Sequence, residues 1–140
     1  LNVSLFNGAF LFLIAILDLL VLLFYFKALQ NDEASVVIVF YQLVPVFGIA
    51  LGYLILGEVL STLQIVAALI IMAGTTIVSF EVDETYSLIL RKQTIIYMLL
   101  ASFFWALEAT LFKMVALEEN VIQSLFWNNV VLVLIGVGIF

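Results

Sequence analysis

Long apolar runs separated by short polar segments dominate the sequence. A helix needs about 20 apolar residues to cross the hydrocarbon core of a bilayer. Five runs meet or approach this length, and we place them at residues 5–29, 34–57, 61–80, 93–117 and from 121 to the end of the chain. The runs lack the alternation of β-barrel strands, and their short connections make neighbouring helices antiparallel. The pattern therefore predicts an all-α membrane bundle of five transmembrane helices.

Composition supports a membrane protein and argues against nucleic acid, cofactors and metals as partners. Hydrophobic residues make up 67% of the chain and charged residues 10%, which excludes an ordinary soluble domain. The net charge of −6 and the lack of a basic cluster argue against nucleic acid. Because Cys and His are absent, thiolate chemistry, His-based catalysis and Cys/His metal sites are unavailable within these residues, and we expect neither a cofactor nor a metal site. The chain begins at Leu1 and ends within an apolar run, which we interpret as a fragment.

Asp18 lies deep in the first predicted span. A central acid costs about 2.5 to 3.5 kcal/mol on insertion scales, which the surrounding apolar residues offset. Asn7, Asp18 and Tyr25 fall on one helical face, and this polar stripe is expected to point into the bundle. Two interpretations stay open, a proton or substrate site and a neutral, hydrogen-bonded acid that orients helices.

Glu108 is the second acid within a span. Trp105 and Phe112 share its helical face, so aromatic rings bracket the carboxyl group and can line a cavity. Lys113 lies well round the helix from Glu108 and is a poor partner for it, so we expect Lys113 to extend to the membrane interface. Again a functional and a structural role both remain open.

Neutral polar residues open the last span. Ser124 and Asn128 lie one turn apart on one face, with Asn129 adjacent. Such side chains can bind a polar solute, but they also hold helices together at about 0.6 to 2 kcal/mol each. We favour the structural role and keep Asn128 as a cavity candidate.

The stretch "YQLVPVFGIALGYLILGE" contains an interruption in the second span. Pro45 has no N–H group, which is expected to leave the Tyr41 carbonyl without its helical donor and to bend the helix. Gln42 faces the same side as Pro45. A bent helix beside an amide is one way to build a solute site near the middle of a membrane.

Small residues and one acid complete this region. Gly48 and Gly52 form a surface that permits close helix approach, and we assign Gly48, Gly52 and Gly74 to helix packing. Glu58 marks a turn at the membrane boundary, where it is expected either to cap the next helix or to help gate a pathway.

From Glu33 to Gly74 the sequence "EASVVIVFYQLVPVFGIALGYLILGEVLSTLQIVAALIIMAG" resembles the drug/metabolite transporter superfamily, in its EamA-type branch. The similarity consists of an Ala-Ser pair opening a span, a proline within that span, and "LGE" followed by a short turn and an apolar helix. The later segment "YMLLASFFWALEATLFKMV" is similar to the first helix of the second repeat in that family, with Trp105 and Lys113 at the expected places.

This resemblance implies ten helices in two inverted five-helix repeats. Residues 1–81 would be the last three helices of the first repeat, 82–92 a connecting loop, and 93–140 the first two helices of the second repeat. It also implies cytoplasmic termini, whereas the positions of Lys27, Arg91 and Lys92 favour the opposite orientation.

The expected function is secondary transport of a small organic solute by alternating access. Candidates for the substrate or proton pathway are Asp18, Gln42, Pro45, Trp105, Glu108 and Asn128. Coupling to protons and a homodimer stay open, and we expect the plasma membrane of a prokaryote as the location. The alternative is a membrane scaffold that transports nothing. An enzyme would need a catalytic constellation, and these residues show none.

Overall fold

The computed structural model describes the backbone of residues 5–80 and 92–139, and their side chains except at 5, 6, 35, 36, 75–80 and 139. This part of the chain is helical and contains no strand. Its elements are α1 (Leu5–Leu29), α2 (Ala34–Val39), the 3-10 turn η1 (Phe40–Gln42), α3 (Leu43–Leu56), α4 (Thr62–Phe80), α5 (Lys92–Glu118) and α6 (Val121–Ile139). The all-α prediction is confirmed.

The helices agree closely with the predicted spans. Four segments are long and apolar enough to cross a membrane, namely Asn7–Leu29, Val37–Leu56, Lys92–Glu118 and Val121–Gly138. The side chains of α4 are described only as far as Gly74, and the apolar segment identified there, Thr62–Gly74, is shorter than the other four. The connection expected at 82–92 lies outside the described residues except for Lys92, where α5 begins.

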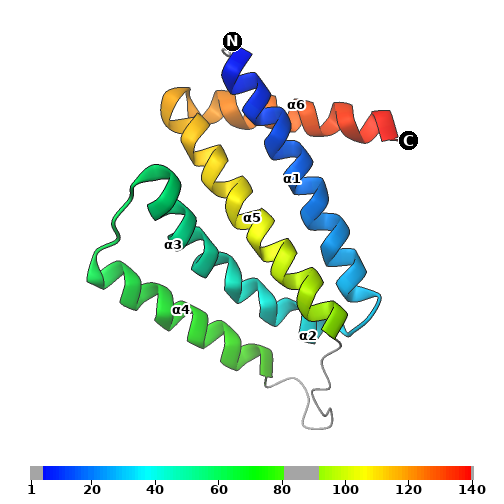
Figure 1. Cartoon of the computed structure of the whole chain (residues 1–140), viewed down its shortest axis with the longest axis vertical. Coiled ribbons are helices and arrows are strands. Elements are labelled where there is room, and N and C mark those ends of the chain that lie inside the picture. The colour runs from blue at the N-terminus through cyan, green and yellow to red at the C-terminus, as the bar shows by residue number, and fades with distance from the viewer. Residues whose placement is uncertain (1–4, 81–91, 140) are drawn as a thin grey trace.

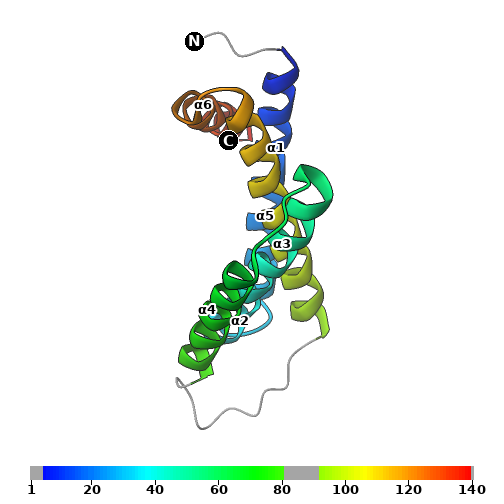
Figure 2. The same cartoon turned by 90° about the vertical axis from the view of Figure 1, so that its left-hand side faces the viewer.

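The helices α1, α5 and α3 lie side by side, with α5 between the other two (Figure 1). The turned view shows that this arrangement is thin (Figure 2). α4 lies beyond α3 and contacts mainly α2 and η1, whereas α6 crosses near the N-terminal end of α1. Each helix therefore presents apolar side chains outward, and these suit a lipid environment.

The α1–α5 interface is the most extensive contact in the chain. On α5 a row of mostly small buried side chains recurs every four residues, comprising Thr94, Met98, Ser102, Ala106 and Thr110. Each step of four residues turns the row by about 40° round the helix, so Thr94 bonds Asp32 whereas Ser102 bonds Phe40 of η1. Small side chains along the row let neighbouring backbones approach closely. Helix association in lipid depends on such close packing, because lipid tails are as apolar as leucine.

Polar bonds fix both ends of this antiparallel pair. Near one end, Asn7 Nδ2 donates to Glu119 Oε1 at 2.8 Å. Near the other, the hydroxyl of buried Thr94 donates to Asp32 Oδ2. Because Asn7 is itself 5% exposed, the prediction that the polar stripe of α1 points into the bundle is confirmed at its first position.

The second span is interrupted where the proline suggested, but with different hydrogen bonding. The 3-10 turn precedes α3, so Pro45 falls in the first turn of that helix, where its missing N–H is tolerated. At the end of η1 the carbonyls of Phe40 and Tyr41 accept backbone N–H groups, and the prediction of a free Tyr41 carbonyl is wrong. The tighter i→i+3 bonding of the 3-10 turn satisfies it. Phe40 O also accepts the Ser102 hydroxyl from α5 at 3.0 Å.

The turn after α3 depends on glycine. Gly57 adopts the left-handed conformation with φ of 66°, and its N–H donates to Tyr53 O at 3.1 Å, which is the bond of the αL motif. The N–H of Glu58 also donates to Gly52 O, at 3.2 Å. The next helix is capped by Ser61, whose hydroxyl accepts the Gln64 N–H, while Gln64 Oε1 accepts the Ser61 N–H. This capping box leaves Glu58 no capping role, so that part of the prediction is wrong.

Replacing Gly57 by alanine is expected to lower the free energy of unfolding by about 1 to 2 kcal/mol, because a Cβ atom is strained in the left-handed conformation. The measurement is unfolding of the purified protein by SDS titration in mixed micelles. Gly74→Ala is the matched control, since a Cβ atom there meets nothing within 4 Å and helical φ suits alanine. Equal effects at the two positions would contradict the assigned role of Gly57.

Candidate functional site

The two intramembrane acids face each other across the α1–α5 interface. The antiparallel register that joins Asn7 to Glu119 and Asp32 to Thr94 sets Asp18 opposite Glu108, near enough for their charges to interact. Both side chains are half-buried. Among the described residues neither carboxyl group has a hydrogen-bond or ion-pair partner. The fold thus brings together two candidates separated by ninety residues.

Three aromatic rings contact one another in series, beginning with Trp105 one turn from Glu108 on α5. The Tyr41 ring packs edge-on against Trp105, with centroids 4.9 Å apart, and against Tyr25 at 5.4 Å. Trp105 lies one turn from Glu108 on α5, and Tyr25 lies two turns from Asp18 on the same face of α1. We call Asp18, Tyr25, Tyr41, Trp105 and Glu108 the carboxyl–aromatic site.

The sequence did not predict the Tyr41 side chain as a member of this site, although Tyr41 lies only four residues before Pro45. The available signal was its position at the interruption of a span, where a side chain leaves the regular helical face. Gln42 is its neighbour in η1 and is half-buried. No described contact joins Gln42 to the site, and its role stays a prediction.

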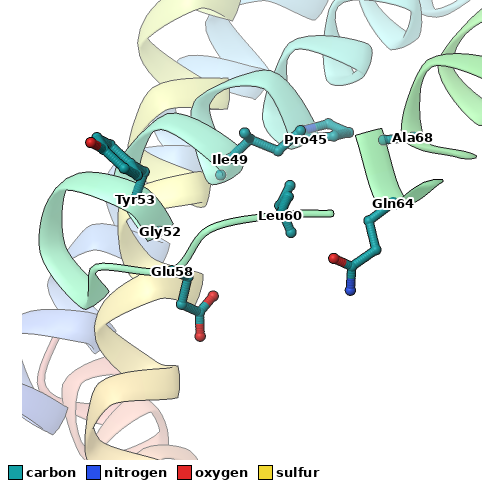
Figure 3. A pocket seen from close by; sticks show the side chains of 9 residues that line it. Pro45, Ile49, Gly52, Tyr53, Glu58, Leu60, Gln64 and Ala68 are labelled. Carbon is teal, nitrogen blue, oxygen red and sulfur yellow. The ribbon is translucent and has the colours of Figure 1, made fainter. Parts of the chain in front are cut away.

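Pro45 lies elsewhere, in an open groove between α3 and α4 (Figure 3). The groove has a volume of about 360 Å³ and is lined by Pro45, Gly48, Ile49, Gly52, Tyr53, Glu58, Leu60, Gln64 and Ala68. Cβ atoms added at Gly48 and Gly74 would meet no described atom within 4 Å. Helix packing by these glycines remains a prediction.

Glu58 forms an ion pair with α5 at the rim of this groove. Its Oε1 lies 2.6 Å from Lys113 Nζ, whereas its Oε2 lies 3.6 Å from the position a Cβ atom would take on Gly52. That distance is an ordinary van der Waals contact, so a Cβ atom at Gly52 would touch the carboxylate without displacing it. Lys113 is half-exposed but pairs with Glu58, which we did not predict.

The sequence contains a signal for this pair. The second and fourth spans of an antiparallel bundle run in the same direction, so their ends reach the same side of the membrane. Glu58 ends the second span and Lys113 lies near the end of the fourth, and their charges are opposite.

The polar residues of α6 form a separate group. Ser124 Oγ, Trp127 Nε1 and Asn128 Oδ1 are buried without a hydrogen-bond partner in the described chain. Trp127 packs against the α1–α5 core, and Asn129 donates to Leu125 O of its own helix at 2.7 Å. No described contact joins Asn128 to the carboxyl–aromatic site, and its two possible roles stay open.

Comparison with known protein families identifies the family of this chain. Residues 2–80 match the model of the EamA-like transporter family, which is more than half of the chain and includes α1 to α4. No curated protein and no solved structure matches the chain.

Proposed function

Because the chain belongs to the EamA-like transporter family, we propose that it takes part in secondary transport of a small organic solute across a membrane by alternating access. The observation that carries this proposal is the pair of opposed acids, Asp18 and Glu108, within two apolar spans. Ionisable groups are expensive in the hydrocarbon region and serve substrate or ion pathways when they occur there.

The same pair supports coupling to protons. A carboxyl group in a membrane span can bind and release a proton, and two that interact do so as a unit. The other titratable groups of the carboxyl–aromatic site are Tyr25 on α1 and Tyr41 on η1, while α6 carries none. Asp18 and Glu108 are therefore the groups we assign to proton binding.

The organisation we propose places residues 1–81 in a first repeat and 93–140 in a second. Support comes from the extent of the family match, which ends with α4. In this arrangement α1 and α5 belong to different repeats, and the carboxyl–aromatic site lies between them. Sites between repeats, near the middle of the membrane, are usual in secondary transporters.

The test is a flux measurement in proteoliposomes. We expect at least one member of a panel of labelled small organic solutes to accumulate when a pH gradient is imposed, and a protonophore to abolish this accumulation. Protein-free liposomes are the control. Solute levels equal to that control under pH, sodium and solute gradients would indicate a scaffold and overturn the proposal.

A further inference from the structure

The carboxyl–aromatic site combines negative charge with aromatic faces, and this combination selects a ligand. We propose that it binds the ammonium group of an organic cation, so that the solute is a protonated amine or a quaternary ammonium compound. That this cation is the transported solute rests on the proposed function. Binding of cations to the site is a separate property and can be measured without transport.

The first support is the charge balance around the acids. Each cationic side chain in the described part of the chain either has another partner or lies far from the two acids. Lys113 pairs with Glu58, and Lys27 Nζ lies 5.8 Å from the centroid of the Tyr97 ring. Lys92 begins α5, about 24 Å along the helix axis from Glu108 at 1.5 Å per residue. The carboxyl pair therefore has no counter-ion from the described chain.

An unpaired charge within a membrane is costly, and a ligand of opposite charge offsets that cost. Two carboxyl groups on facing helices, each half-buried, leave part of their surface accessible to such a ligand. An anionic solute would instead be repelled, and no basic side chain of the described chain offers it a partner here.

The second support is the aromatic array. Trp105 lies about 4.5 Å along the axis from Glu108, so a cation that contacts the carboxylate lies within reach of the indole ring. Tyr41 stands nearly perpendicular to Trp105, at 84°, and tilted by 36° to Tyr25. Rings from α1 and η1 thus extend the aromatic surface that begins at Trp105, and the three rings face different directions.

These ring orientations suit ammonium groups in particular. The negative face of an aromatic ring attracts a cation within about 6 Å of its centroid, and aromatic cages are a common way to bind quaternary ammonium ligands. A neutral solute would gain only apolar contact from the same rings.

Equilibrium binding to the purified protein tests the inference, with probes in pairs that differ in charge. Choline is compared with dimethylbutanol, in which carbon replaces the charged nitrogen, and phenethylammonium with phenylethanol. We expect each cation to bind about tenfold more tightly than its neutral partner, since one cation–π contact with a desolvated cation is of this size. Titration calorimetry measures the affinities.

Variants locate the binding. Asp18→Asn and Trp105→Leu are each expected to weaken cation binding about tenfold or more, and Trp105→Phe to retain most of it. The matched controls are Glu118→Gln, an exposed acid on the same helix as Glu108, and Phe126→Leu, an exposed aromatic residue on α6. Both controls are expected to bind choline as the unaltered protein does.

Equal affinity for cations and their neutral partners would overturn the inference, as would cation binding that neither site variant weakens. A flux assay in which only neutral or anionic solutes move would also overturn it while leaving the transport function intact. Selective cation binding with no flux of any solute would instead support the site and contradict the transport function.

Discussion

Replacing Asp18 by Asn or Glu108 by Gln is expected to abolish solute accumulation driven by a pH gradient. Each change removes a group that can bind a proton within an apolar span, while the amide keeps nearly the same shape. We expect no loss of membrane insertion, because a charged residue at the centre of a span costs about 2.5 to 3.5 kcal/mol and the amide carries no charge. Proteoliposome uptake under an imposed pH gradient is the measurement.

Solute exchange at equal pH on both sides separates the roles of the acids. A variant that still exchanges solute but no longer accumulates it has lost proton coupling alone. Glu118→Gln, at the exposed end of α5, is the control and is expected to transport normally. Normal accumulation by both Asp18→Asn and Glu108→Gln would refute a coupling role for the pair.

Cross-linking the Glu58–Lys113 contact is expected to stop transport reversibly. An exposed ion pair contributes about 0.2 to 1 kcal/mol, so this contact can break and reform readily while α3 and α5 move relative to each other. The chain contains no cysteine, and the double substitution Glu58→Cys, Lys113→Cys therefore introduces the chain's sole pair of thiols. A short thiol-cleavable cross-linker should arrest solute flux, and reduction should restore it.

A second cysteine pair provides the matched control. Asn7→Cys with Glu119→Cys joins α1 to the end of α5, where the native side chains are 2.8 Å apart. We expect this cross-link to form as readily and to leave flux unchanged, because the interface it joins is the most extensive in the chain. Flux that continues after cross-linking of the 58–113 pair would show that this contact does not open during transport.

The spans could be predicted from sequence because lipid leaves so few alternatives. Any apolar run of sufficient length must satisfy its backbone internally, so hydropathy alone set the limits of α1 and α5 to within a residue or two. The interruption of the second span was also predicted from Pro45. Its hydrogen bonding was not, because the 3-10 turn satisfies the Tyr41 carbonyl from the backbone, and the contact of the neighbouring Phe40 carbonyl with the Ser102 hydroxyl joins residues 62 apart in the sequence.

The candidate site was predicted only as separate pieces. Asp18 and Glu108 could each be found as acids within apolar runs, but hydropathy does not say which helices are neighbours. Lipid-facing and helix-facing positions are both apolar, and the distinction depends on side-chain size. The buried small residues of α5, such as Ser102 and Ala106, recur at a spacing of four and mark the side of the helix that packs against other helices.

The two polar bonds at opposite ends of the α1–α5 pair restrict how this protein can change shape. Sliding α5 along α1 by one turn, about 5.4 Å, would break the Asn7–Glu119 and the Asp32–Thr94 bonds together. These two helices should therefore travel as one rigid body, although we assign them to different repeats. We therefore expect the boundary between moving parts to lie between this helix pair and α3 with α4, rather than at the proposed boundary between the repeats.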